Sequence, residues 1–288
     1  MPNYIDKLEI SGLHIDIHTD APLQITDAFL PFQSFFEKAD ILAEVRQTDQ
    51  LPCIKGERVY DSDTCFWIDT GDGLVSVFQD AEQDNHIYAM RQKLDDHHVV
   101  IWYLPGYGKC FCQDHNTFFH MRFADLICPF GRMILHASLI KSAFGGLLFA
   151  GPSRIGKSTQ ADLWHKSEGA QLLNGDKPIL AKNDRGNWLA YGSPYAGSSR
   201  IYVNSCVPVR AIIMLKQGKC NEISRLNTAQ AFRRLYENLI VNVWDRNFIH
   251  MVCDLATDLV KKVPVYELVC TKDTRAVQVV KRTLEGER

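Results

Sequence analysis

The stretch "LLFAGPSRIGKSTQADLW", residues 147–164, runs from an apolar segment through a glycine-containing turn into a segment typical of a helix. Its centre, Gly151 to Ser158, matches the pattern G-x-x-x-x-G-K-[ST], a loop that surrounds the phosphates of a nucleotide. Such a loop must leave a strand and open a helix, so that successive backbone N–H groups point at one anion. The flanking residues favour that arrangement. The stretch therefore predicts a nucleotide-binding P-loop (Walker A), against the alternative of a glycine-rich turn that binds nothing.

The individual residues of the loop suggest their roles. The two glycines permit backbone torsions and close approaches that a Cβ atom would obstruct. Lys157 places a compact cation on the outer phosphates, and the hydroxyl of Ser158 is the expected magnesium ligand. The predicted nucleotide-binding set is Gly151, Pro152, Ser153, Arg154, Ile155, Gly156, Lys157, Ser158 and Thr159.

Two further residues, one before and one after the loop, are close enough along the chain to reach the phosphates that the loop would bind. His136 lies in the strand expected before the hairpin that leads into the loop, and Asp176, in "LLNGDKP", ends the strand expected after the loop helix. We expect both residues to lie at the sheet edge where the phosphates bind. The predicted catalytic residues are Asp176, His136 and Lys157. The predicted metal ligands are Ser158, Asp176 and His136. For His136 the alternative is a strand histidine whose hydrogen bonds are satisfied locally.

These motifs together carry a family resemblance. His136-Ala137-Ser138, the P-loop and "LLNGD" resemble the nucleotide-binding core shared by HPr kinase/phosphorylase and phosphoenolpyruvate carboxykinase, over roughly residues 130–215. In that group a His before the loop and an Asp after its helix surround the metal and the transferred phosphate. The resemblance implies ATP with Mg²⁺ (or Mn²⁺) as the bound species. Where the group usually has paired acids, this chain has Gly175, Asp176 and Lys177.

Arg200 is a further catalytic candidate, because its planar cation suits the charge on a transferring phosphoryl group. The alternative is a surface residue at the start of a strand. The turn at residues 192–194, followed by Tyr195, is expected to border the acceptor.

The chain as a whole predicts an α/β (α+β) fold with two domains. The sequence predicts a β-rich accessory domain of unknown role over residues 1–125, with a hairpin over residues 66–80. It predicts the P-loop kinase-like domain over residues 126–288. Within the latter we expect one strand over 170–182 and, from its three-to-four-residue apolar spacing, a helix over 228–244.

Composition excludes several classes of protein. The 288 residues are 46% hydrophobic and 23% charged with a net charge of −2, a balance that favours a globular protein and gives no reason to expect nucleic acid or membrane as a partner. Nine irregularly spaced cysteines and the lack of an export signal predict reduced thiols and a cytoplasmic protein.

The sequence thus predicts an ATP-dependent kinase that transfers the γ-phosphoryl group of Mg-ATP to a hydroxyl acceptor, either a protein serine or a small molecule. Two alternatives stay open: an enzyme like phosphoenolpyruvate carboxykinase, and an ATP-binding regulatory protein without turnover, which the single carboxylate would suit. The expected partners are a nucleotide triphosphate and a hydroxyl-bearing substrate. The acceptor and the oligomeric state, a homo-oligomer included, stay open.

Overall fold

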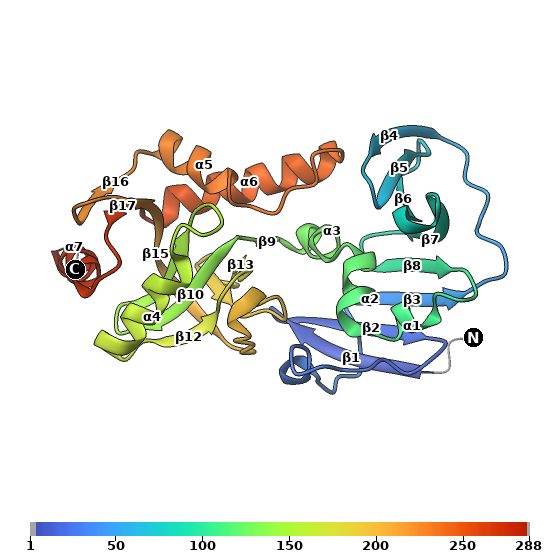
Figure 1. Cartoon of the computed structure of the whole chain (residues 1–288), viewed down its shortest axis with the longest axis horizontal. Helices are drawn as coiled ribbons and strands as arrows, with labels where there is room; N and C mark the ends of the chain where they lie inside the picture. The colour runs from blue at the N-terminus through green and yellow to red at the C-terminus, as the bar shows by residue number, and fades with distance from the viewer. Residues whose placement is uncertain (1–3, 287–288) are drawn as a thin grey trace. The chain divides into compact units, whose positions relative to one another are not determined.

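The computed structural model describes residues 4–286 as a mixed α/β chain with two large sheets (Figure 1). The chain divides into two compact units. Unit 1 comprises Met1–Pro129 with Asn242–Arg246, and unit 2 comprises Phe130–Val241 with Asn247–Arg288. The division after Pro129 lies near the boundary expected at 125/126, and the return of residues 242–246 to unit 1 was not expected from the sequence.

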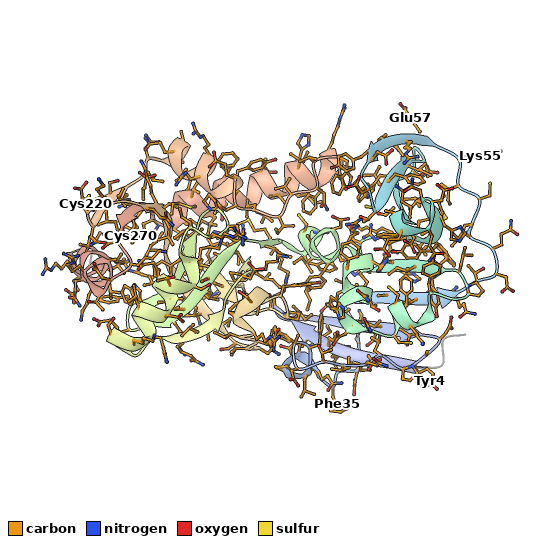
Figure 2. The ribbon with its side chains drawn as sticks, in the orientation of Figure 1. Tyr4, Phe35, Lys55, Glu57, Cys220 and Cys270 are labelled. Carbon is orange, nitrogen blue, oxygen red and sulfur yellow. The ribbon has the colours of Figure 1, made fainter. Side chains whose placement is uncertain are left out.

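Unit 1 contains an eight-stranded sheet in the order β1-β2-β3-β8-β7-β6-β5-β4. Its strands are β1 (Tyr4–Ile10), β2 (Leu13–Thr19), β3 (Ile41–Gln47), β4 (Glu57–Asp61), β5 (Cys65–Asp69), β6 (Leu74–Asp80), β7 (His86–Lys93) and β8 (His98–Tyr103). Three short helices follow β8: α1 (Gly108–Phe111), α2 (Asp114–Met121) and α3 (Phe123–Ile127). Glu57 on the edge strand β4 projects outward (Figure 2).

The hairpin expected over residues 66–80 is present, with β5 and β6 paired antiparallel around the turn that contains Gly71. Gly71 has φ of +84°, a left-handed conformation that a glycine adopts without strain.

Unit 2 is built on a nine-stranded sheet whose main path runs β12-β10-β11-β15-β14-β13-β9. The strands are β9 (Arg132–Ile134), β10 (Ala137–Ser142), β11 (Gly145–Ala150), β12 (Gln171–Asn174), β13 (Ile179–Lys182), β14 (Trp188–Tyr191), β15 (Cys206–Gln217), β16 (Glu222–Arg225) and β17 (Val265–Cys270). The long strand β15 joins two parts of the sheet, because its beginning pairs antiparallel with β14 and its later part pairs parallel with β11 and β17. β11 is buried along almost its whole length, as its continuous apolar sequence requires of a central strand.

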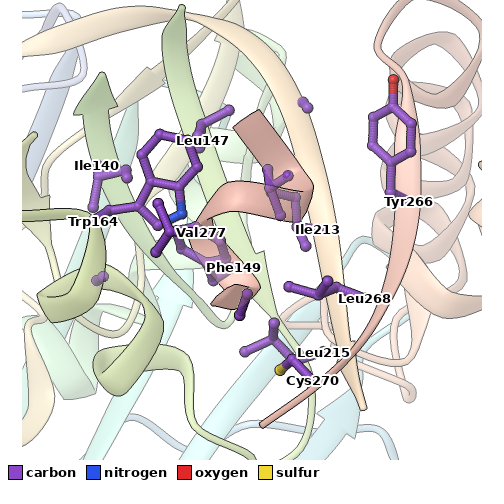
Figure 3. Close-up of a cluster of buried hydrophobic side chains, with 14 of the residues drawn as sticks. Ile140, Leu147, Phe149, Trp164, Ile213, Leu215, Tyr266, Leu268, Cys270 and Val277 are labelled. Carbon is purple, nitrogen blue, oxygen red and sulfur yellow. The ribbon is translucent and has the colours of Figure 1, made fainter. Parts of the chain in front are cut away.

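The helices of unit 2 are α4 (Lys157–Glu168), α5 (Thr228–Tyr236), α6 (Arg246–Lys262) and α7 (Thr274–Gly286). α4 and α7 contact each other and the β10–β12 and β16–β17 strands, respectively. Between helices and sheet lies a buried apolar cluster in which the fully buried Trp164 lies among Ile140, Leu147 and Val277 (Figure 3). α4 ends at Gly169, which has φ of +66° and donates its N–H to the carbonyl of His165.

Two expected elements differ from the structure. Residues 170–182 form two strands, β12 and β13, because a turn at residues 175–178 carries the chain from β10 to a pairing with β9. The helix expected over 228–244 ends at Tyr236, and Leu239 instead forms a β-bridge with Leu135. In both cases pairing with a distant strand overrides the local pattern.

Within residues 4–286, no helix combines the length and the apolar character that crossing a membrane demands. All nine cysteines are free thiols, as expected from their spacing.

Candidate functional site

The P-loop connects β11 to α4 in unit 2, as the sequence predicts. Three of its residues have positive φ angles: Gly151 at +146°, Arg154 at +64° and Gly156 at +117°. A Cβ atom on Gly151 would lie 3.2 Å from Cγ2 of Ile155, whereas one on Gly156 would meet nothing. A glycine is therefore required at position 151 both by the positive φ angle and by the close contact with Ile155. At position 156 it is required by the positive φ angle alone, which turns the chain into the first residue of α4.

Lys157 lies inside the curve of this loop. Its ammonium donates hydrogen bonds to the carbonyls of Gly151 at 3.0 Å and Pro152 at 3.3 Å, and the residue is 8% exposed. Burial lowers the pKa of Lys157, and the negative charge of Asp176 partly opposes that shift. Lys157 therefore lies at the mouth of the loop, close enough to Asp176 for the charges of the two side chains to interact.

The register of three strands brings His136 and Asp176 to the edge of the sheet where the P-loop begins. Ala150, the last residue of β11, pairs with Ala137 of β10, and Leu139 of β10 pairs with Asn174, the last residue of β12. His136 directly precedes β10, and Asp176 follows β12 by two residues. The backbone N–H of Ala137 donates to the carbonyl of Asp176 at 2.9 Å, which fixes the two segments together.

The side chains of these two residues contact each other. Nε2 of His136 lies 3.1 Å from Oδ1 of Asp176, with the side chains 32% and 25% exposed. Burial lowers the pKa of His136, the charges of Lys157 and Lys177 lower it further, and Asp176 opposes the shift. These opposing effects act on an imidazole that lies within hydrogen-bond distance of the Asp176 carboxylate.

The structure places the other predicted residues as follows. Ser158 is exposed in the first turn of α4, and Thr159 follows it half-buried. Arg200 is exposed, has φ of +51°, and makes no ion pair with Asp176 in the described part of the chain. The site thus brings together the P-loop, His136 and Asp176, while Arg200 stands outside their contacts.

Two side chains that the sequence analysis did not select support the site. Gln217, near the end of β15, donates from Nε2 to the loop carbonyls of Arg154 at 3.4 Å and Ile155 at 3.3 Å. Ser138 donates its hydroxyl to the carbonyl of Gly175 at 3.0 Å. Both act through main-chain atoms of residues remote in sequence. No local motif marks Gln217, and Ser138 belongs to the motif His136-Ala137-Ser138, which does not reveal its partner Gly175.

The donor atoms of the site suit a hard divalent cation. Mg²⁺ prefers oxygen ligands and is usually held by one or two carboxylates together with phosphates and water. The carboxylate of Asp176 and the hydroxyl of Ser158 are oxygen ligands of that kind. No three His, Cys, Asp or Glu side chains between residues 4 and 286 are grouped so as to hold a metal ion.

Comparison with known proteins adds little to this geometry. No family model matches the chain, and no curated protein matches it. Among solved structures, the Hpr(Ser) kinase/phosphatase from Coxiella burnetii is similar to this chain with 13% sequence identity and a TM-score of 0.32. The match covers 54% of this chain and 93% of that one. This similarity is weak.

Proposed function

We propose that unit 2 binds Mg-ATP and transfers its γ-phosphoryl group to a hydroxyl of a protein or small molecule. The observation that carries the proposal is the His136–Asp176 pair, 3.1 Å apart, at the sheet edge where a P-loop with a buried lysine begins. A phosphate cradle alone would suit many nucleotide-binding proteins. A carboxylate held beside it supplies what phosphoryl transfer to a hydroxyl requires, a group that orients the acceptor and accepts its proton.

In this proposal the loop amides and Lys157 hold the phosphates, and Ser158 and Asp176 hold the metal. The metal, when bound, neutralises charge on the phosphate oxygens. The acceptor oxygen bonds to the γ-phosphorus, the bond to the bridging oxygen breaks, and ADP departs. The acceptor proton passes to the carboxylate of Asp176, while the imidazole of His136, 3.1 Å away, keeps that carboxylate oriented.

The alternative without turnover keeps one argument in its favour. In the described part of the chain, Asp176 is the carboxylate that contacts His136 and whose charge acts on Lys157. If this carboxylate is fully engaged with the metal, proton acceptance has no second group. A protein of that kind would bind ATP tightly and release no product.

One set of measurements tests these readings. Calorimetric titration with Mg-ATP measures binding, and transfer from γ-labelled ATP into a cell extract, separated into protein and small-molecule fractions, measures reaction. We expect Lys157→Ala to abolish binding. We expect Asp176→Asn to retain nucleotide binding, weakened only in the part that depends on Mg²⁺, while reducing transfer by at least about 100-fold. Lys166→Ala, on the exposed face of the same helix, serves as the matched control.

Labelled product in either fraction supports the kinase. Binding without product in any fraction supports the regulatory protein. Wild-type protein that gives no heat with Mg-ATP overturns the nucleotide site.

A further inference from the structure

Asn174, the last residue of β12, is a polar side chain at the centre of the site's framework. It is 1% exposed, so its amide must find its hydrogen-bond partners within the protein. Its Oδ1 accepts the backbone N–H groups of Asp176 at 3.0 Å and Lys177 at 2.8 Å. This is the hydrogen-bond pattern of an Asx turn, and it fixes the backbone of the residue whose carboxylate faces His136.

The other end of the same amide binds a different segment. Nδ2 of Asn174 donates to the carbonyls of Ser193 at 3.1 Å and Tyr195 at 3.3 Å, with the hydroxyl of Ser193 also 3.3 Å away. That hydroxyl in turn donates to the carbonyl of Lys177 at 2.6 Å. One buried side chain therefore joins the turn that carries Asp176 to the segment that begins at Ser193.

The joined segment, residues 193–199, also lies directly against Asp176. Gly197 has φ of +54°, and a Cβ atom on it would lie 3.1 Å from Cγ of Asp176 and 3.2 Å from its Oδ2. A Cβ atom on Gly175 would lie 2.0 Å from the hydroxyl oxygen of Ser199. The segment and the turn thus contact each other at both ends, and Asn174 supplies the hydrogen bonds between them.

We propose that Asn174 is a positioning residue, which holds the carboxylate of Asp176 and the 193–199 segment in one fixed arrangement. The proposal rests on the proposed function and deepens it: Asp176 holds the metal and meets the acceptor only while Asn174 fixes its backbone. The segment against Asp176 is then one wall of the acceptor site, and its position is set by the residue that sets the carboxylate.

The test measures how much magnesium adds to nucleotide affinity, so that it does not require turnover. The dissociation constant of a fluorescent ATP analogue is measured in EDTA and in Mg²⁺. The first value divided by the second is the factor by which Mg²⁺ strengthens binding, and this ratio falls when a metal ligand is lost or displaced. Removing a residue that orients a metal ligand typically costs about 10- to 100-fold in metal affinity. We therefore expect Asn174→Ala to lower this ratio by about tenfold or more, towards the value for Asp176→Asn, with the affinity in EDTA unchanged.

The chain offers a matched control. Asn183, in the turn between β13 and β14, accepts the N–H groups of Arg185 at 3.1 Å and Asn187 at 2.9 Å through the same kind of turn. Asn183→Ala removes an equivalent turn and should leave the ratio at its wild-type value. Asn174→Ser keeps an oxygen acceptor for the turn but loses the amide donor, and we expect it to restore part of the ratio. It also serves as the test if Asn174→Ala fails to fold.

The outcomes are distinguishable. A wild-type ratio in both Asn174 variants overturns the positioning role and leaves the nucleotide site intact. An affinity that falls equally in Mg²⁺ and EDTA also overturns it, because the side chain would then support the fold and not the carboxylate. No nucleotide binding by the wild type, or no loss of the ratio in Asp176→Asn, overturns the proposed function itself.

Discussion

At the scale of single residues, the site depends on backbone torsions that few side chains tolerate. Gly156 has φ of +117° and an open space where a Cβ atom would lie, so a substitution there meets strain and no clash. We expect Gly156→Ala to lower the free energy of unfolding by about 1–3 kcal/mol and to weaken ATP binding, because the loop amides shift. Urea unfolding and calorimetry measure the two effects. Gly73→Ala, at an equally open position without positive φ, should change neither, and equal effects in both variants would contradict the assignment.

His120 of unit 1 gives a prediction for pH dependence. Nδ1 lies 2.7 Å from the carbonyl of Asn116, and since a carbonyl only accepts, Nδ1 carries the proton. Nε2 then accepts from the hydroxyl of Tyr88 at 2.9 Å. Burial lowers the pKa of His120 from 6.5 to about 4; the positive charge of Arg122 also lowers it, and the hydrogen bond to the Asn116 carbonyl opposes the shift.

The sign of the effect on stability follows from that shift. The folded-state pKa lies below the unfolded value, so the stabilisation is fully present above pH 6.5 and is lost as the pH falls towards 4. The loss amounts to about 3 kcal/mol over that range. Urea unfolding of unit 1 as a function of pH measures it. His120→Gln, which cannot be protonated, should show a flatter profile, and an unchanged slope would contradict the role of this histidine.

At the scale of elements, the packing of α4 against the sheet holds the P-loop in place. Trp164 is fully buried, so Trp164→Ala should lower the free energy of unfolding of unit 2 by about 3–5 kcal/mol. The indole N–H has no hydrogen-bond partner among residues 4–286, so Trp164→Phe should cost much less than Trp164→Ala. Chemical denaturation followed by circular dichroism measures both. Equal losses in the two variants would mean that the indole N–H contributes to stability.

Elements whose signals are local were predictable from sequence. The P-loop, its flanking strand and helix, and the hairpin around Gly71 each depend on residues a few positions apart. The turn at Asn174 was not found, because three of the five hydrogen bonds of its side chain go to residues about twenty positions further along the chain. The helix predicted through residue 244 was too long for the same reason, since Leu239 pairs with Leu135. Within the site, the order of the strands along the sequence predicts that His136 and Asp176 lie at one sheet edge. The hydrogen bonds that orient their side chains cannot be predicted from that order.

At the scale of the whole molecule, the two units should respond separately to ligand. The proposed ligand binds residues of unit 2, so Mg-ATP at 100 times its dissociation constant should stabilise that unit by about 2.7 kcal/mol. Differential scanning calorimetry should show the transition of unit 2 moving to higher temperature while that of unit 1 stays. A shift of unit 1 alone would place the nucleotide elsewhere.

Unit 1 offers the complementary variant. The Trp244 ring lies with its centre 4.1 Å from that of Trp67 and 4.5 Å from that of Tyr60. Trp244→Ala removes these contacts, and we expect the transition of unit 1 to fall by a few degrees while Mg-ATP still shifts that of unit 2. A loss of the ATP shift in this variant would contradict the separation of the two responses.

The return of residues 242–246 to unit 1 has a consequence for synthesis of the protein. Domains generally fold in order as the chain emerges from the ribosome, the N-terminal one first. Here the N-terminal unit stays incomplete until Trp244 has left the exit tunnel, because that ring and Asn242, which binds Asp125, belong to it. By then most of unit 2 has also been made. The eight strands of the first unit are complete by Tyr103, but the side chains that pack against them from residues 242–246 arrive much later. A ribosome stalled before residue 242 would therefore hold a first unit that cannot reach its final packing.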